Sequence, residues 1–320
     1  GRRIDPVIDR TARYRFSHDR VAEVARARLS SEAREAVHLR FGRWLGECGE
    51  ERLFEAARHL GVGGLGLADV AERTRFAEVE RRAAVAARRQ ASFPLALECF
   101  RAGLALLGPR RWVDHFSAAR ELQLGAAEAA YLVADAAALS ALLDEADAAL
   151  RDPADRAHLS FLRLKGQMAQ NRLQDALETG LRALAALGEP LPRRPGKAQA
   201  AAALLRTKLA MRRWTDERLL QLPPCDDRRT VEAQRILSEL RNISYVARPE
   251  LFPAIIDKKL QLTVTCGLVP SSPAAFASFG VLLVVTGDHL GSQRFGELGL
   301  LLADRVEFHE ARPETQFLHL

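Results

Sequence analysis

Residues 171–184 read NRLQDALETGLRAL and residues 94–104 read PLALECFRAGL, two variants of one helical pattern. Apolar residues recur in both at intervals of three and four residues, as in Leu97, Phe100 and Leu104, which places them on one face of a helix. Both stretches also carry a pair of small residues seven positions apart: Ala96 with Gly103, and Ala176 with Ala183. Two helical turns separate the members of each pair, so they share a face that a neighbouring helix can approach closely.

The same pattern returns elsewhere in the chain. Residues 287–300 read GDHLGSQRFGELGL, and a weaker copy runs from Ala134 to Ala146. Repeated helical hairpins of this kind cannot bury their apolar faces alone and therefore stack on their neighbours. The spacing between copies is irregular. We therefore expect an all-α fold, a tetratricopeptide-like right-handed α-solenoid of helical hairpins, with a loose rather than a fixed period.

Composition agrees with close helix packing. Of the 320 residues, 48% are apolar but only 6% are aromatic, and alanine and leucine supply most of the apolar content. The formal net charge is +6, and arginine dominates the basic residues. These arginines alternate with glutamate and aspartate at helical spacing, which is typical of solvated helix faces. Together with the absence of an aromatic stripe for base stacking, this argues against a nucleic-acid partner.

Three proline-containing segments interrupt the helical pattern, near residues 188–197, 222–228 and 270–273. Proline disfavours helix interiors, so each segment predicts a break within the repeat region. Residues 61–66 read GVGGLG, but they follow a helical pattern rather than a strand. We interpret them as a helix end and a loose connection, and not as a dinucleotide-binding loop.

The four cysteines lack the spacing of a zinc site, and we expect them to be buried reduced thiols in a cytoplasmic protein. The longest apolar run, residues 273–287, is too short to span a bilayer, so no membrane partner is expected. The chain begins with glycine and stops within a helical pattern. We therefore expect a piece of a longer polypeptide, with the repeat region continuing beyond it.

The N-terminal residues 13–21 read RYRFSHDRV, a short strand-like segment that leads into a helix. Residues 16–21 of this segment, the helix that follows them, and residues 38–45, HLRFGRWL, resemble the junction in a family of STAND-class, AAA-related signalling ATPases. In the fullest members a Ser/Thr protein kinase precedes the ATPase, and a GAF domain and a sensor histidine kinase follow the helical region. The stretches LGEPLP at 187–192 and LLQLPP at 219–224 are similar to that family's two proline breaks.

The resemblance implies that residues 1–45 end a winged-helix domain and that residues 46–320 form the tetratricopeptide-like region. It implies that His18 contacts the β-phosphate of ADP when the upstream ATPase domain is present. The alternative is that His18 packs against the wing, with Asp19 as a helix cap. Residues 25–27 depart from the family, which carries an aromatic residue there. ATP and ADP would be ligands of the parent chain, and we expect no cofactor, no metal and no catalytic residue within this fragment.

The sequence thus predicts a non-catalytic sensor and coupling arm of a multidomain signalling ATPase–kinase. Its partners would be a protein or peptide on the concave helical surface and the upstream ATPase domain in cis. Two alternatives stay open. One is the helical arm of a STAND-type transcriptional activator, and the other is a free-standing tetratricopeptide-like scaffold. An independent enzyme is disfavoured, because the chain contains neither a P-loop motif nor kinase catalytic motifs.

Overall fold

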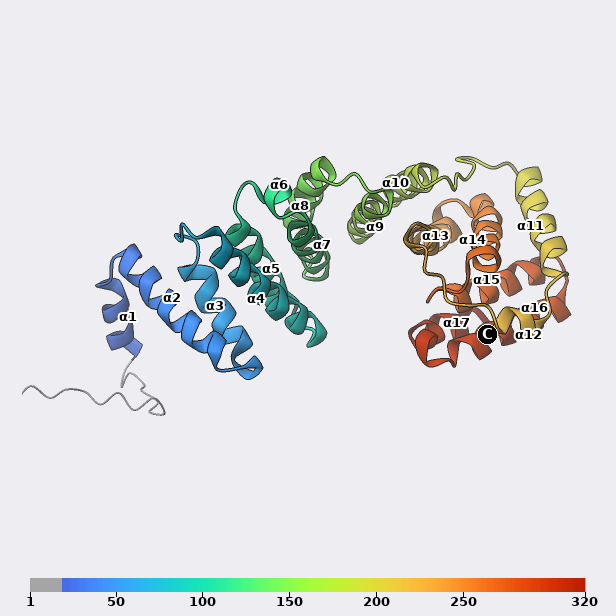
Figure 1. Ribbon diagram of the computed structural model, residues 1–320. Coiled ribbons are helices and arrows are strands. Elements are labelled where there is room, and N and C mark those ends of the chain that lie inside the picture. The colour runs from blue at the N-terminus through green and yellow to red at the C-terminus, as the bar shows by residue number, and fades with distance from the viewer. Residues whose placement is uncertain (1–18, 320) are drawn as a thin grey trace, which may run out of the picture. The chain divides into compact units, whose positions relative to one another are not determined.

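The computed structural model describes residues 19–319, and over this range the protein is all-α (Figure 1). The described residues contain no β-strand, and the one isolated bridge among them pairs Pro224 with Leu268. Contacts divide the chain into two compact units that meet at Ala126 and Ala127, within helix α7. Among residues 19–319, no helix is both long and apolar enough to cross a bilayer.

In the first unit, the helices that start at Ser31 and Val70 begin at side-chain caps. The Ser30 side chain accepts a hydrogen bond from the Ala33 amide, and Asp69 accepts from the amides of Ala71 and Glu72. Such caps satisfy amides that have no partner within the helix. The elements are α1 (Asp19–Ala27), α2 (Ser31–Glu47), η1 (Glu50–Arg52), α3 (Leu53–Gly63), α4 (Val70–Arg89), α5 (Phe93–Leu107), α6 (Arg111–Asp114) and α7 (Phe116–Leu132).

The second unit contains two apolar cores. One gathers side chains of α9, α10, α13 and α14, including Leu177 and Leu240, and the other is centred on Phe276 and Phe279 of α15. The elements are α8 (Ala136–Ala149), α9 (Pro153–Ala169), α10 (Leu173–Ala186), α11 (Lys197–Met211), α12 (Asp216–Leu220), α13 (Arg228–Ala247), η2 (Pro249–Leu251), α14 (Phe252–Cys266), α15 (Ser272–Val285), α16 (His289–Ala303), η3 (Val306–Ala311) and α17 (Arg312–His319).

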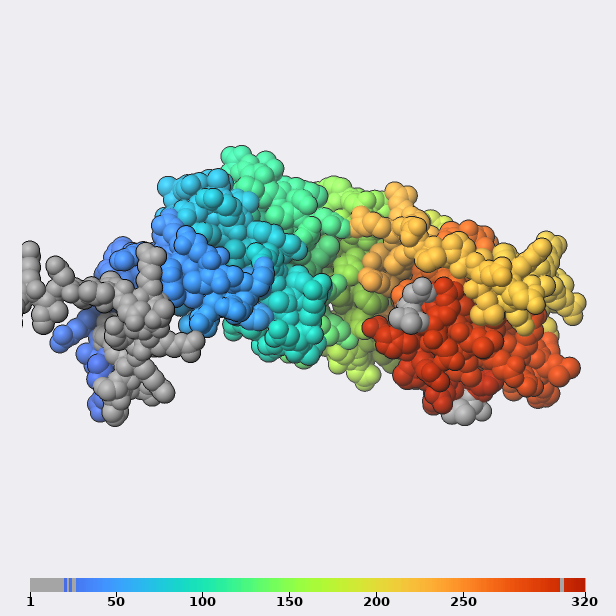
Figure 2. All heavy atoms as spheres, turned by 60° about the horizontal axis from the view of Figure 1, so that its bottom comes forward, coloured from blue at the N-terminus to red at the C-terminus, as the bar shows by residue number. Residues whose placement is uncertain are grey.

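Figure 2 shows one face of this unit, where the yellow segment that contains α12 lies beside the red C-terminal helices. Arg294 of α16 makes this junction. Its guanidinium donates to the Asp216 carboxylate and to the carbonyl of Trp214, at 2.8 Å each.

One turn geometry recurs in four helical hairpins, α4–α5, α7–α8, α9–α10 and α15–α16. In each, three residues separate the helices and the middle one lies in the left-handed region. The amide of the residue after it donates to a carbonyl five residues earlier, at 2.9–3.0 Å. Hydrogen bonding of this kind satisfies the carbonyls left open at a helix end. The left-handed residues are Ala91, Ala134, Asn171 and Gly287.

Small residues lie where the sequence pattern predicts close helix contact. Ala96 and Ala176 are fully buried. A Cβ atom on Gly103 would lie 2.8 Å from a methyl carbon of Leu122, and one on Gly180 would lie 2.7 Å from a methyl carbon of Leu240. Neighbouring helices therefore pack closely against these positions, as predicted.

The first two predicted breaks are non-helical up to their last residues, which begin α11 and α13. The third prediction is only partly right, because Ser272 and Pro273 already form the first turn of α15, a position that tolerates proline. The observed connection before α15 spans residues 267–271, and it contacts the second break. The amide of Cys225 donates to the carbonyl of Leu268, and the Leu268 amide donates to the carbonyl of Pro223, both at 2.8 Å. Gly267 permits this pairing, since its φ is 110° and a Cβ atom there would lie 2.5 Å from the Pro223 oxygen. The sequence did not predict that these segments would meet.

Two expectations need correction. Helix α3 does not stop at the start of the glycine stretch but runs to Gly63, because that residue packs against the backbone of Leu39 in α2. The expectation of four buried thiols is wrong for Cys48 and Cys266, which are exposed near the C-terminal ends of their helices. Cys99 is buried and Cys225 is half-buried, and all four are free thiols.

Candidate partner-binding groove

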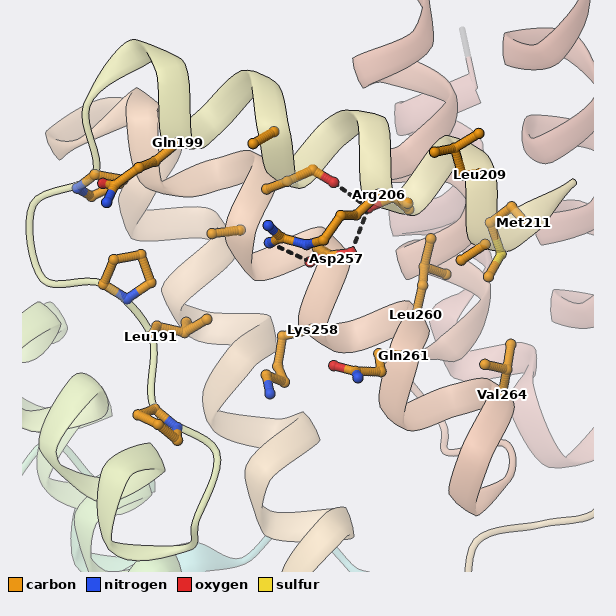
Figure 3. A pocket seen from close by; sticks show the side chains of 18 of the residues that line it. Leu191, Gln199, Arg206, Leu209, Met211, Asp257, Lys258, Leu260, Gln261 and Val264 are labelled. Atoms are coloured by element: carbon orange, nitrogen blue, oxygen red, sulfur yellow. Dashed lines mark hydrogen bonds and ion pairs between the residues drawn. The ribbon is translucent and has the colours of Figure 1, made fainter.

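A groove of about 710 Å³ lies in the second unit between α11 and α14 (Figure 3). Helix α11 forms one wall and α14 the other, and the proline-containing link between α10 and α11 closes one end. Apolar side chains make up much of its lining: Pro190, Leu191, Pro192, Leu209, Met211, Leu260 and Val264. Clefts of this size with mostly apolar walls are common sites of ligand and peptide binding.

Helix α11 forms this wall because it is only partly covered by the rest of the unit. It begins after Gly196, whose amide donates to the Gln199 side chain at 3.1 Å. The helix buries one narrow stripe, comprising Ala203, Thr207 and Met211. Two leucines one turn apart, Leu205 and Leu209, stay 59% and 53% exposed. Helix α11 therefore presents an apolar surface that the unit itself does not fill.

Asp257 of α14 fastens the two walls together. Its carboxylate accepts a hydrogen bond from the Thr207 hydroxyl at 2.8 Å and one from the Arg206 guanidinium at 3.0 Å. Figure 3 shows these bonds crossing from α11 to α14. Thr207 is buried, whereas the Arg206 side chain is 65% exposed, so the hydroxyl bond is the better shielded of the two.

A second ion pair holds the proline-containing link against α14. The Lys258 ammonium lies 2.8 Å from a carboxylate oxygen of Glu189, just before the prolines. Arg248 donates to the carbonyl of Arg193 at 2.7 Å and so holds the far part of the link. The end of the groove is thus fixed by polar contacts, and proline restricts its backbone further.

The groove has the chemistry of a docking surface. Its lining combines apolar side chains with the charged groups of Arg206, Asp257 and Lys258. An amphipathic or extended peptide can bury apolar side chains in such a groove while its polar groups meet the charged walls. No three His, Cys, Asp or Glu side chains converge in a metal-binding cluster among the residues that the structure describes.

The strongest polar clusters of the second unit lie in its interior instead. His158 of α9 lies between two carboxylates, 3.1 Å from Glu128 and 3.3 Å from Glu232. Burial alone would lower the pKa of His158, but hydrogen bonds to the two glutamates raise it to about 9. His158 therefore joins α7, α9 and α13 as a charged residue at neutral pH.

Lys259 is the second buried base. It is fully buried, and its amine lies 2.7 Å from the Ser238 hydroxyl and 3.1 Å from that of Ser271. Burial lowers the pKa of Lys259 well below its usual value. These contacts join α13 and α14 to the start of α15, which is a structural role.

His18, the single site residue that the sequence predicts, lies outside the described residues. The helix expected after it is confirmed as α1, and residues 38–45 lie within α2. The groove residues were not predicted. The available signal was Leu209 in a helix that follows a proline-containing break, but sequence alone does not reveal which face of a helix is left uncovered.

Comparison with models of known protein families finds no match to this chain, and comparison with curated proteins also finds none.

Proposed function

We propose that this chain is a non-catalytic sensor and coupling arm of a large cytoplasmic multidomain signalling ATPase–kinase. Its helical hairpins would form a tetratricopeptide-like right-handed solenoid that binds a protein or peptide partner. The observation that carries the proposal is the α11–α14 groove, whose walls are joined through Asp257 and whose end is fixed by Lys258. Helical repeat proteins commonly use such surfaces for peptide recognition.

The recurrent hairpin turn supports the repeat interpretation. Four hairpins close through one left-handed residue and the same backbone hydrogen bond, although their sequences differ at that residue. Such recurrence is expected when a chain repeats one supersecondary unit. The likeness of residues 16–21 and 38–45 to the ATPase-family junction supports the attachment to an upstream ATPase.

Coupling requires that the partner distinguish two states of the ATPase. A ligand shifts an equilibrium only by the difference between its affinities for the two states. In our proposal the ADP-bound state is closed, with His18 near the β-phosphate, and partner binding favours the open ATP-bound state. The arm supplies the partner site, and the chemistry takes place in the upstream domain.

The test uses the full-length parent protein. A photo-crosslinking amino acid at position 209, compared with position 205 on the same helix, identifies the protein that occupies the groove. The purified partner is then added to the parent, and ATP turnover is measured. We expect turnover to change at least about fivefold, in line with typical coupling free energies.

Matched variants separate the groove from the rest of the helix. Leu209→Glu places a charge in the groove and should abolish the response, whereas Leu205→Glu should retain it, because Leu205 is equally exposed but does not line the groove. An equal response in both variants would contradict the proposal, as would a parent reading frame without a P-loop.

A further inference from the structure

Glu80 occupies an unusual position inside the first unit. It lies on α4, its residue is only 1% exposed, and its helical neighbours Ala83 and Ala84 are fully buried. The Cys99 thiol hydrogen-bonds to the carboxyl group, but the oxygen Oε1 has no hydrogen-bond partner. Burying a carboxyl group with an unpartnered oxygen costs free energy, and native proteins rarely retain such a group without a reason.

This carboxyl lies beside a cavity of about 580 Å³ between α3, α4 and α5, and Glu80 forms part of the cavity lining. Phe54, Val62 and Leu95 supply apolar walls. Gly61 lies next to the unpartnered oxygen, since a Cβ atom on that glycine would be 2.5 Å from Oε1. The absence of a side chain at position 61 therefore leaves room for the carboxyl group at the cavity wall.

The other charged and titratable groups that line the cavity are Glu55 and Arg58 of α3, and Glu98 and Cys99 of α5. Glu55, Arg58 and Glu98 are exposed at its rim, and Glu55 is paired with Arg52 at 2.9 Å. Burial raises the pKa of the Cys99 thiol to about 12, so it stays protonated. No cation within the described residues neutralises Glu80, and burial raises the pKa of its carboxyl to about 8.

We propose that this cavity binds a primary alkylammonium group, with the Glu80 carboxylate as its buried acceptor. The apolar walls suit the methylene stem of such a ligand, and the unpartnered oxygen accepts a hydrogen bond from its ammonium. Two sources share this chemistry, namely the lysine side chain of a protein partner and a free aliphatic amine. The site belongs to the first unit and is independent of the α11–α14 groove.

Binding is coupled to proton release. The protonated Glu80 carboxyl loses its proton to solvent, and the resulting carboxylate pairs with the incoming ammonium, which keeps its own three protons. Raising the pH from 7 to 9 ionises the carboxyl before binding, while an alkylammonium stays charged. Affinity should therefore rise about tenfold over this range, as follows from a pKa of about 8.

The test is a titration of the whole chain with n-butylammonium, followed by NMR shifts of the Gly61, Cys99 and Ala102 amides. We expect saturable shifts and a dissociation constant about ten times smaller at pH 9 than at pH 7. The neutral analogue n-butanol should show no such pH dependence. A blocked Gly-Lys-Gly peptide distinguishes the sources: binding equal to that of the amine indicates a lysine of a partner, and weaker binding indicates a free amine.

Three variants make the result decisive. Glu80→Gln keeps the shape of the side chain and should abolish the pH-dependent binding, whereas Glu98→Gln at the rim should change affinity less than twofold. Gly61→Ala should weaken binding by displacing the carboxyl group. Amide spectra of each variant verify folding. No saturable binding of n-butylammonium, or unchanged pH-dependent binding in Glu80→Gln, would overturn the proposal.

Discussion

His158 shows how a single buried residue can make stability depend on pH. Its imidazole joins Glu128 and Glu232, which come from helices 30 and 74 residues away in sequence. Arg235 adds a further contact, 3.5 Å from the same ring and 3.0 Å from Glu232. Because its pKa in the folded protein, about 9, exceeds the unfolded value near 6.5, folding takes up a proton.

We therefore predict that His158→Phe lowers the free energy of unfolding by about 3 kcal/mol at pH 6–7. The stabilisation is fully present below the unfolded pKa and is lost as pH rises through about 9, so the difference between variant and wild type should shrink toward zero by pH 10. Urea unfolding of both proteins at a series of pH values measures this difference in the free energy of unfolding.

The exposed His289 provides the control, since His289→Phe should have little effect at any pH. A destabilisation by His158→Phe that stays constant from pH 6 to pH 10 would show that His158 contributes only packing.

At the same scale, sequence could not reveal the buried charged residues. In the sequence, polar and apolar residues are mixed around Glu80, His158 and Lys259, as they are along any partly exposed helix. Their burial depends on neighbours from distant helices, such as Glu232 for His158 and Ser271 for Lys259. The spacing of apolar residues predicts which face of a helix is buried, but it does not predict which residues of other helices cover that face.

At the scale of the structural elements, two hairpin turns contain an alanine in a strained backbone conformation, and a substitution can relieve that strain. Ala91 and Ala134 have φ values of 56° and 58°, in a region that side chains with a Cβ atom disfavour. We predict that Ala91→Gly and Ala134→Gly each raise the free energy of unfolding by roughly 0.5–1 kcal/mol, because glycine adopts this conformation without strain.

The reverse change at the equivalent position, Gly287→Ala, should lower stability by about 1 kcal/mol. As a control, Ala137→Gly on the exposed side of α8 should also lower stability, since glycine weakens a helix. Thermal unfolding shows whether each substitution raises or lowers the stability of the protein. Destabilisation by glycine at positions 91 and 134 would contradict the shared turn geometry.

The close packing of α2 against α3 predicts opposite effects on stability for two glycine-to-alanine substitutions. A Cβ atom on Gly63 would lie 2.4 Å from the backbone nitrogen of Leu39, so Gly63→Ala must push α2 and α3 apart. We expect a loss of about 1–3 kcal/mol. Gly46 has no atom within 4 Å of its Cβ position, and Gly46→Ala should stabilise α2 by roughly 0.5–1 kcal/mol. Chemical denaturation measures the stability of both variants. Equal changes in stability would contradict the close approach of α2 and α3 at Gly63.

The helices themselves were largely predictable from the sequence. The apolar periodicity of residues 94–104 and 171–184, the small residues within them and the proline breaks correspond to α5, α10 and the connections observed. Two features were not predictable: the continuation of α3 to Gly63, which rests on contact with Leu39, and the pairing of residues 223–225 with Leu268. Both depend on segments that only the folded chain brings together.

At the scale of the whole molecule, the α11–α14 groove is, in the proposed function, the place where a partner influences chemistry elsewhere in the parent protein. Sequence predicted a partner-binding helical array but not this groove, because its walls come from helices separated by the whole of α12 and α13. In the proposed coupling, the groove binds the partner, whereas the predicted site residue His18 contacts the nucleotide. Linkage requires that any effect of the partner on nucleotide binding be matched by an equal effect of nucleotide on the partner.

The most direct test of this coupling is the partner's affinity for the full-length parent protein in two nucleotide states. The partner identified at position 209 is titrated against parent loaded with ADP, and against parent loaded with a non-hydrolysable ATP analogue. We predict dissociation constants that differ at least about fivefold, with tighter binding in the ATP-analogue state. Equal dissociation constants in the two states would contradict this coupling.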